Sequence, residues 1–199
     1  MPINRTSKTK SAISKAAMEL FAAHGYKGTS VRNIASKVGI KQSALYNHFK
    51  NKEDIFLTIC ADIFSTPFSS KNNLEDAKSG KKFFANYVVQ YKLISFDATK
   101  EKLFRIMMIE LLQDKSLRES FMSEYHNKNI ALLSEALFIM MQAGLIRSSD
   151  PMLMANEFLA PLFYYRLQVT LLRIDSLSTT SLSTIFEKHV DFFWDSISK

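Results

Sequence analysis

The segment from Thr29 to Glu53 constrains the fold more than any other part of this 199-residue chain. Its first half carries apolar residues at the spacing that places them on one face of a helix: Val31, Ile34, Ala35 and Val38. Ser30 or Thr29 can cap the start of this helix, because a hydroxyl oxygen accepts a hydrogen bond from a free backbone amide there. Gly39 follows the last apolar residue, at a position where the left-handed backbone costs little only for glycine. The sequence therefore predicts a short helix that ends in a sharp turn.

A second short helix is predicted after the turn. Its apolar stripe consists of Ile40, Leu45 and Phe49, and polar side chains fall largely outside that stripe: Lys41, Gln42, Ser43, Tyr46, Asn47 and His48. Two helices joined by a glycine turn, with donors and acceptors over the outer face of the second, are typical of the helix-turn-helix. An ordinary helical hairpin with a solvated polar face is the alternative that the spacing alone leaves open.

The net charge of +7 is concentrated in the same part of the chain. Residues 1–53 contain 10 Lys and Arg but only two acids, Glu19 and Glu53, whereas residues 54–199 contain 16 basic and 17 acidic residues. A positive segment of this kind favours the phosphate backbone of a nucleic acid as its partner. The charge therefore supports the helix-turn-helix over the plain hairpin, although a membrane surface or an acidic protein would also suit it.

The composition predicts an all-α protein. Apolar residues make up 47 % of the chain, the 5 glycines and 4 prolines are few, and strand-type alternation is hard to find. We expect about nine helices in two parts, an N-terminal three-helix bundle with the helix-turn-helix over residues 1–53 and a larger C-terminal helical bundle over residues 54–199. Outside the Thr29–Glu53 segment the expected helices are 11–24, 51–66, 81–96, 102–112, 116–143, 151–173 and 180–197, after a basic arm over residues 1–9.

The sequence also argues against several classes of protein. It contains no phosphate-cradling loop, metal-ligand cluster or nucleophile motif, so we expect neither an enzyme nor a cofactor. Cys60 is the single cysteine and cannot form an intramolecular disulfide. No signal peptide or convincing membrane span is evident, and a cytoplasmic location is the expectation.

Residues 11–56 resemble the TetR (AcrR-type) family of transcriptional regulators. The resemblance rests on an N-terminal helix followed by the pattern G-T-S-V-R-x-I-A-x-x-V-G-I-x-x-x-x-L-Y-x-H-F-x-N-K-E. It implies a protein that binds a palindromic operator in double-stranded DNA as a homodimer, usually represses transcription, and is released by a small molecule bound in the C-terminal domain. A ligand-independent DNA-binding or architectural protein is the alternative.

The resemblance also implies roles for individual residues. Gln42 and Ser43 are expected near base edges, and Tyr46, His48 and Lys52 near phosphates. Arg32 reaches either a base or a phosphate. This fits their chemistry, since Gln can pair with adenine, Arg with guanine, and Lys and Tyr can hold the backbone. Lys41 stands where the family commonly has a small capping hydroxyl, so either the cap is missing or lysine adds a phosphate contact. The full predicted set of DNA-binding residues is Thr29, Ser30, Arg32, Lys41, Gln42, Ser43, Tyr46, Asn47, His48 and Lys52.

The C-terminal part is expected to hold an unknown, largely apolar effector among its middle helices. The candidate residues are Tyr87, Tyr91, Phe104, Met108, Tyr125, Phe163 and Arg166. Aromatic residues and methionine suit an adaptable apolar cavity, although stripes of this kind also form ordinary cores. Arg166 is either a pocket residue with an anionic partner or part of a surface or dimer salt bridge. The last two helices, over residues 151–173 and 180–197, are implied to form the dimer interface, where exposed Phe192, Phe193 and Trp194 would be costly in a monomer.

Overall fold

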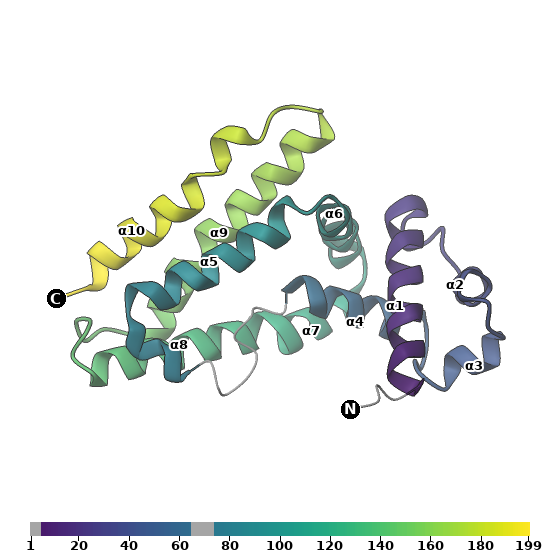
Figure 1. The fold of residues 1–199 in the computed structure, drawn as a ribbon, viewed down its shortest axis with the longest axis horizontal. Helices are drawn as coiled ribbons and strands as arrows, with labels where there is room; N and C mark the ends of the chain where they lie inside the picture. The colour runs from purple at the N-terminus through teal and green to yellow at the C-terminus, as the bar shows by residue number, and fades with distance from the viewer. Residues whose placement is uncertain (1–4, 65–73) are drawn as a thin grey trace. The chain divides into compact units, whose positions relative to one another are not determined.

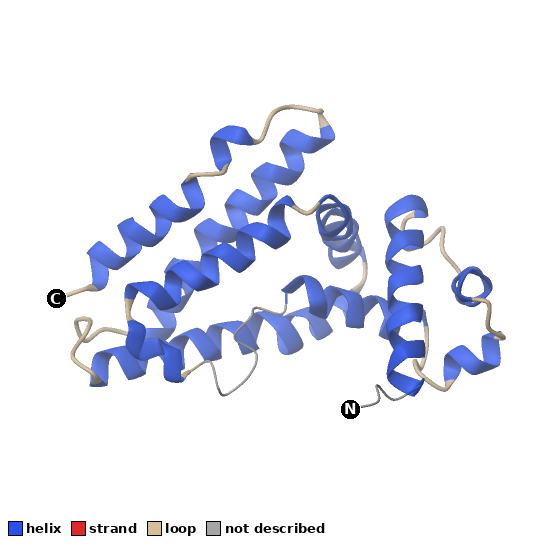
Figure 2. Cartoon of the chain, in the orientation of Figure 1, coloured by secondary structure: helices blue, strands red, loops and turns tan. Residues whose placement is uncertain are grey.

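The computed structural model describes residues 5–64 and 74–199, and in these residues the chain is helical without a strand (Figures 1 and 2). Ile146 and Ser198 form one isolated β-bridge. The all-α prediction is confirmed. The ten α-helices of the described residues are α1 (Arg5–His24), α2 (Val31–Val38), α3 (Gln42–Tyr46), α4 (Lys52–Phe64), α5 (Lys81–Phe96), α6 (Ala98–Gln113), α7 (Lys115–Phe121), α8 (Asn127–Gln142), α9 (Pro151–Ile174) and α10 (Ile185–Ile197).

Several expected boundaries differ from the observed ones: α6 begins at Ala98 and not at residue 102, α10 begins at Ile185 and not at residue 180, and two further differences change the organisation of the chain. The first helix begins at Arg5 and not at residue 11, so most of the expected basic arm is helical, while residues 1–4 lie outside the described residues. The long helix expected over residues 116–143 is divided into α7, a π-helical turn over Met122–His126, and α8. Apolar residues keep helical spacing on both sides of the π-helical turn, so the sequence pattern alone predicts one continuous helix.

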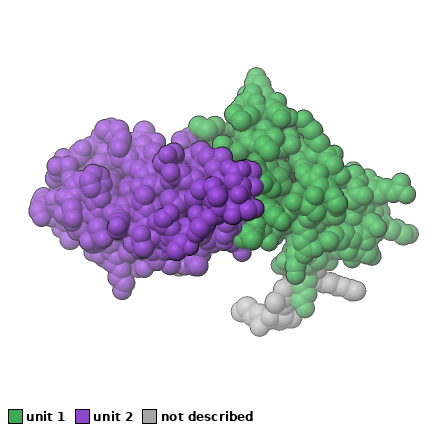
Figure 3. Space-filling model, turned by 90° about the horizontal axis from the view of Figure 1, so that it is seen from above, with its two compact units in different colours: residues 1–64, 98–122 green, residues 65–97, 123–199 purple. Residues whose placement is uncertain are grey.

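The chain forms two compact units (Figure 3). Unit 1 comprises the described residues of 1–64 and 98–122, with α1–α4, α6 and α7. Unit 2 comprises those of 65–97 and 123–199, with α5, α8, α9 and α10. The expected division after Glu53 does not coincide with this one, since α4 and α6 pack with α1 and with each other, and α7 packs with α4 and α6. α5 comes between the two segments of unit 1, and no local sequence signal marks such a discontinuous unit.

The core of unit 1 holds its first four helices together. Phe21 of α1 meets Phe56 of α4 edge to face at 5.4 Å between ring centroids. Leu45 and Phe49 lie buried at the α3 segment, and Ile34 lies buried on α2. These are the apolar positions that the spacing predicted to face inward. Their burial leaves the polar side chains of α3 on the outside.

Unit 2 has a larger aromatic core. Phe158 of α9 lies close to Phe84 of α5 and Phe193 of α10, at 4.8 and 5.0 Å between ring centroids. α9 continues as one helix through Pro161. In the described part of the chain, every helix is too short or too polar to cross a membrane.

Candidate nucleic-acid interface

α2 is fixed at both ends by local signals. Ser30 is its N-cap and forms a capping box with Asn33: the Ser30 hydroxyl accepts from the Asn33 amide at 3.1 Å, and the Asn33 side chain accepts from the Ser30 amide at 3.0 Å. Gly39 closes the helix at φ 76°, a conformation that glycine adopts without strain. Arg32 is exposed between these ends, whereas Ile34 and Ala35 are buried. α2 therefore has one inward and one outward face.

α3 is a short helix with an almost entirely polar exterior. It has five residues, and Leu45 is its buried anchor. Exposed positions cover the rest of the turn and the residues beside it: Lys41, Gln42, Ser43, Tyr46 and Asn47. The Gln42 amide donates to the Tyr46 hydroxyl at 3.2 Å, which holds these two side chains together one helical turn apart. His48 follows the helix and is half-buried.

Lys41 occupies the N-cap of α3 without forming a cap. Its backbone is extended, at φ −70° and ψ 147°, and its side chain makes no capping hydrogen bond. The departure from the family pattern at this residue therefore has a structural consequence, because a first-turn amide of α3 lacks the side-chain acceptor that serine or threonine would supply. The Lys41 ammonium is exposed instead.

The sequence predicted Thr29 and Lys52 on this exposed surface, but their polar groups lie elsewhere in the structure. Thr29 is only 2 % exposed, and its hydroxyl donates to the Gly25 carbonyl at 2.9 Å. The Lys52 ammonium donates to the carbonyls of Tyr26 and Thr29, at 2.9 and 3.1 Å. Both side chains are directed into the turn between α1 and α2. In the structure both polar groups are engaged within the chain, and their predicted contacts with DNA stay predictions.

The predicted ligand-binding residues are divided between the two units. Phe104 and Met108 lie on α6 in unit 1, Phe104 fully buried, while Tyr87, Tyr91, Phe163 and Arg166 lie on α5 and α9 in unit 2. The Tyr125 side chain lies outside the described residues. Helical spacing shows which side of a helix is apolar but not which neighbour covers it, so the sequence could not separate the two groups.

Three members of the unit 2 group meet in the structure. The rings of Tyr87 and Tyr91 are stacked at 6.4 Å, and the Arg166 guanidinium lies 5.8 Å from the Tyr91 ring centroid. Burial raises the pKa of Tyr91, and the positive charge of Arg166 opposes that rise. Arg166 is 1 % exposed, which excludes the surface salt bridge that the sequence left open. Phe163 is half-buried on α9.

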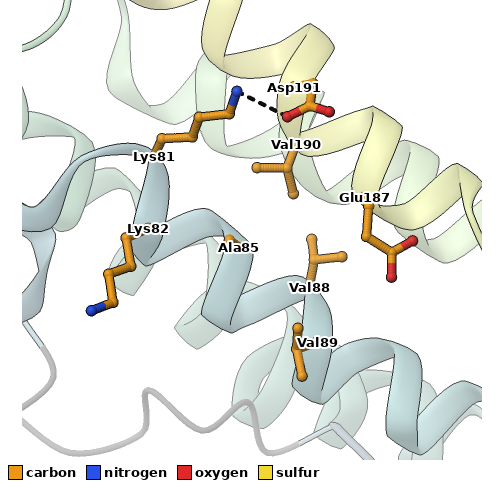
Figure 4. A pocket seen from close by; sticks show the side chains of 8 residues that line it. All are labelled: Lys81, Lys82, Ala85, Val88, Val89, Glu187, Val190 and Asp191. Carbon is orange, nitrogen blue, oxygen red and sulfur yellow. Dashed lines mark ion pairs between the residues drawn. The ribbon is translucent and has the colours of Figure 1, made fainter.

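Unit 2 also carries a shallow groove between α5 and α10, with a volume of about 400 Å³ (Figure 4). Its floor is apolar and consists of Ala85, Val88, Val89 and Val190. The ion pair of Lys81 with Asp191, at 2.9 Å, crosses one end. A second hollow of about 550 Å³ adjoins it, shares Val89 and Glu187, and extends to Phe96. The seven predicted ligand residues line neither hollow. Val89 could have indicated this groove from the sequence, because it is apolar but falls outside the buried stripe of α5.

The face formed by α9 and α10 is rich in exposed apolar side chains. Phe192 is 76 % exposed, whereas Phe193 is 5 % exposed and belongs to the core, and Trp194 is partly buried. The expectation of three exposed aromatic residues is therefore correct only for Phe192. A hollow of about 340 Å³ lies beside Phe192, and Tyr165 and His189 are among its lining residues. The exposed apolar residues of α9 are Met152, Leu153, Tyr164, Leu171 and Ile174.

Comparison with known proteins identifies related sequences for both parts of the chain. The family model described as "Bacterial regulatory proteins, tetR family" matches residues 13–59. The model described as "AefR-like transcriptional repressor, C-terminal domain" matches residues 86–196, more than half of the chain.

Curated relatives match a short part of the chain. The uncharacterized HTH-type transcriptional regulator YerO of Bacillus subtilis is 35 % identical over 75 residues, which are 38 % of this chain and 26 % of YerO. The HTH-type transcriptional repressor AcnR of Corynebacterium diphtheriae is 36 % identical over 56 residues, which are 28 % of this chain and 30 % of AcnR. The matched segment thus spans less than a third of either relative.

Solved structures match nearly the whole chain. A complex of SmeT with triclosan has a TM-score of 0.72 at 18 % identity and covers 96 % of this chain and 92 % of that one. SmeT is the repressor of the Stenotrophomonas maltophilia multidrug efflux pump SmeDEF. At this identity the likeness establishes the fold.

Proposed function

Since the chain belongs to the TetR family of bacterial transcriptional regulators, we propose that it represses transcription by binding a palindromic operator as a homodimer. We further propose that a small, largely apolar effector bound in unit 2 releases the DNA. The family and the curated relatives are regulators and not enzymes, and the helix-turn-helix is the DNA-binding element. As a regulator of genes, the protein acts in the cytoplasm.

The observation that carries the proposal is the exposed polar surface of α3. A five-residue helix buries Leu45 and leaves its polar side chains on the outside, within residues 1–53, which carry all of the excess positive charge. Packing does not account for this surface, because a short helix gains little stability from exposed amides and hydroxyls. A partner with hydrogen-bonding edges and phosphates accounts for it.

Each exposed residue has a role within this proposal. Gln42, held by its hydrogen bond to Tyr46, is positioned to read an adenine with two hydrogen bonds. Arg32 on α2 is free to reach a guanine or a phosphate from the neighbouring helix. The remaining exposed residues hold the DNA backbone and set the register. These are Ser30, Lys41, Tyr46, Asn47 and the half-buried His48, while Ser43 lies beside Gln42 near the base edges.

The α9/α10 face supports the proposed dimer. Phe192 and five residues of α9 are exposed apolar side chains, Phe192 and Leu153 line one hollow, and water contact with such side chains is costly. A two-fold axis would pair this surface with its copy, as in most homodimers. Two bound helix-turn-helix units would then lie on successive turns of one DNA face, which matches a palindromic operator.

The aromatic residues around Arg166 support the proposed effector site. Tyr87, Tyr91 and Arg166 place a positive charge among aromatic rings in unit 2. A pocket with a few polar groups among apolar walls suits a small molecule with a polar or acidic end. SmeT, which shares the fold, has been solved with triclosan. We therefore expect aromatic amphiphiles to be the class of effector.

Selection of duplexes from a random-sequence pool tests the proposal. The wild-type protein should enrich a palindrome, and Gln42→Ala should lose preference at one base pair in each half-site, by about 1–3 kcal/mol, with its binding to random duplex unchanged. Gln90→Ala, at an exposed position on α5, is the matched control and should enrich the wild-type sequence. Triclosan can then serve as a probe for release.

Two results would contradict the proposal. Enrichment of no sequence by the wild-type protein would favour the architectural alternative, which binds any duplex through its charge. Full retention of base preference in Gln42→Ala would remove Gln42 from the reading surface.

A further inference from the structure

α9 carries a row of polar side chains along the side that packs against α5. Thr170 and Arg173 follow Arg166 by one and two helical turns, which places all three on one side of the helix. α5 and α9 pack against each other in unit 2 (Figure 1). The Arg166 guanidinium lies 5.8 Å from the ring centroid of Tyr91 on α5. Arg173 donates through Nη2 to the carbonyl of Phe96, the last residue of α5, at 2.7 Å. The row therefore follows the C-terminal part of α5.

Thr170 has a buried hydroxyl without a hydrogen bond. The residue is 3 % exposed, and its Oγ1 atom has no partner among the described residues. A hydroxyl inside a helix often donates to the carbonyl four residues earlier, as those of Thr58, Ser95 and Ser134 do at 2.7–2.8 Å. Thr170 does not form that bond. Its hydroxyl keeps its full hydrogen-bonding capacity inside unit 2, and a buried polar group in this state is destabilising.

Arg173 also has a buried donor that the chain does not use. Its Nη2 donates to the Phe96 carbonyl, but its Nη1 is buried and lacks a hydrogen-bond partner within the described part of the chain. A guanidinium carries five N–H donors in a planar fork and stays charged. The partner that matches this fork is a carboxylate, which accepts two parallel hydrogen bonds from it. Arg173 therefore offers an anion-binding group in unit 2.

Two tyrosine rings on α5 lie beside the first residue of the row. Tyr91, the neighbour of Arg166, is stacked on Tyr87 at 6.4 Å between ring centroids, and Tyr87 is fully buried. Phe158 on α9 meets Tyr87 edge to face at 5.5 Å. Aromatic rings favour one another in such geometries, and hydrogen bonds to a charged group are strongest where water is excluded. A ligand with an aromatic body and a negative end suits both parts of the row.

We propose that Thr170 and Arg173 bind the carboxylate of an aromatic acid whose ring lies beside Tyr91. The two side chains are three residues apart on one face of α9, so the hydroxyl and the guanidinium can reach the same carboxylate. The inference rests on the effector site of the proposed function and narrows its ligand from aromatic amphiphiles to acids.

The two donor atoms also indicate how the acid enters. Both are covered by protein in the structure, so an acid reaches them only when α5 and α9 separate locally. The closed arrangement leaves both atoms unsatisfied, whereas the acid-bound arrangement satisfies them. The acid therefore binds the open arrangement more tightly than the closed one, which is the condition for a ligand to shift a conformational equilibrium.

The test compares acids with their neutral amides in the absence of DNA. Benzoate, 2-naphthoate and 4-biphenylcarboxylate, each paired with its primary amide, are titrated into the protein at neutral pH in a calorimeter. In at least one pair the wild-type protein should bind the acid about a hundredfold more tightly than the amide. The ratio within a pair is the readout, because a variant that only loosens unit 2 weakens the binding of both members alike.

Thr170→Val replaces the hydroxyl by a methyl group of nearly the same shape. We expect it to reduce the acid-to-amide ratio about tenfold and to raise the unfolding temperature of the ligand-free protein by about 3 °C, since it removes an unsatisfied buried hydroxyl. Thr184→Val makes the same change at an exposed position whose side chain forms no capping hydrogen bond. This control should leave both quantities unchanged.

Arg173→Gln keeps a donor for the Phe96 carbonyl but removes the charge and the fork. It should reduce the acid-to-amide ratio about thirtyfold. Arg147→Gln removes the same charge from an exposed position in unit 2 and should leave the ratio at its wild-type value. If Arg173→Gln does not fold, Arg173→Lys, which keeps the charge without the fork, is measured in the same way and should reduce the ratio about tenfold.

Three outcomes would overturn the inference. Equal affinity for acid and amide in every pair would exclude an anion site. A wild-type ratio in both Thr170→Val and the Arg173 variant would assign the acid to another cation of the chain. A lower unfolding temperature in Thr170→Val would show that the hydroxyl is bonded within the protein.

Failure of the inference and failure of the proposed function give different results. A preference for acids in a protein that enriches no duplex would support the anion site and contradict operator binding. Release of an enriched duplex by amides as readily as by acids would support the proposed function and overturn the inference.

Discussion

Units 1 and 2 are both helical, but the residues that indicate function lie in opposite environments. In unit 1 they are polar and exposed on α3, where only Leu45 faces inward. In unit 2 they are aromatic and buried. The ring of Phe158, for example, lies 4.8–5.5 Å from four other ring centroids, those of Phe84, Tyr87, His189 and Phe193. Exposed polar groups on a short helix have no packing explanation, whereas buried rings have a complete one. Function is therefore easier to infer from surface residues than from core residues.

The largest expected effect tests whether the aromatic cluster is the core of unit 2. Phe158→Ala should lower the free energy of unfolding by about 3–5 kcal/mol, because the mutation removes a fully buried ring from between three helices. Trp194 is the only tryptophan and lies in unit 2, so urea unfolding followed by its fluorescence reports on this unit. Phe138→Ala, at a 53 % exposed position on α8, should change the free energy by less than about 0.5 kcal/mol.

The same variant tests whether the polar surface of unit 1 is independent of the core of unit 2. Under conditions where Phe158→Ala is folded, its affinity for random duplex should equal that of the wild type. A large loss of affinity would show that the polar surface of unit 1 depends on the core of unit 2.

The next effect concerns the surface of unit 2. Phe192→Glu should weaken dimerisation by about 2 kcal/mol, or roughly thirtyfold in the dissociation constant, because it places a charge in the centre of the proposed interface. Phe138→Glu introduces the same charge at another exposed phenylalanine and serves as the control. Sedimentation velocity over a concentration series measures both. Equal behaviour of the two variants would remove the α9/α10 face from the interface.

A smaller effect is expected at the start of α3. Lys41→Ser should raise the stability of the protein by about 1 kcal/mol, because serine supplies the N-cap acceptor that lysine lacks. The same change should reduce the salt slope of binding to random duplex by about 0.9 if the ammonium meets a phosphate. Stability and DNA affinity would then move in opposite directions, as expected for a surface residue retained for binding. A gain in stability with an unaltered salt slope would leave Lys41 outside the contact set.

The smallest effect is a pH dependence confined to unit 2. Burial lowers the pKa of His189 below its usual value of 6.5, and its hydrogen bond to the Phe158 carbonyl only partly offsets this. The unfolded chain therefore takes up a proton at a higher pH than the folded one, so stability falls as the pH drops through 6.5 and levels off below the folded pKa. Unfolding followed at Trp194 between about pH 5 and 8 measures the slope. His189→Gln should abolish it, and a slope of unchanged size would assign the effect to another group.

Local signals in the sequence predicted the helix ends well. Gly39 ends α2 in the left-handed conformation, as expected, and Asp150 caps α9 in front of Pro151. These signals work because a cap or a glycine acts on the backbone within a few residues. The polar exterior of α3 was predicted for the same reason, since it depends only on which side of a short helix is apolar.

Contacts between distant residues were beyond the sequence. The Lys52 ammonium reaches carbonyls that are 26 and 23 residues away, and Thr29 is buried by the turn that this contact stabilises. Similarly, Phe104 and Tyr87 each lie in an apolar stripe at helical spacing, but they belong to different units. Side-chain reach and the choice of packing partner are tertiary properties, and residue spacing does not contain them.

The length of α3 limits how much information the protein can obtain from base contacts. Five residues span about 7.5 Å along the helix axis, a distance that covers roughly two base-pair steps. Two fully read base pairs supply about four bits, and a two-fold repeat about eight, whereas one site among a million competitors requires about twenty. Within the proposed operator binding, the difference comes from contacts outside α3, such as Arg32, from the spacing of the half-sites and from the sequence-dependent shape of the DNA. A search for its operators should therefore weight groove width and half-site distance at least as strongly as the contacted bases.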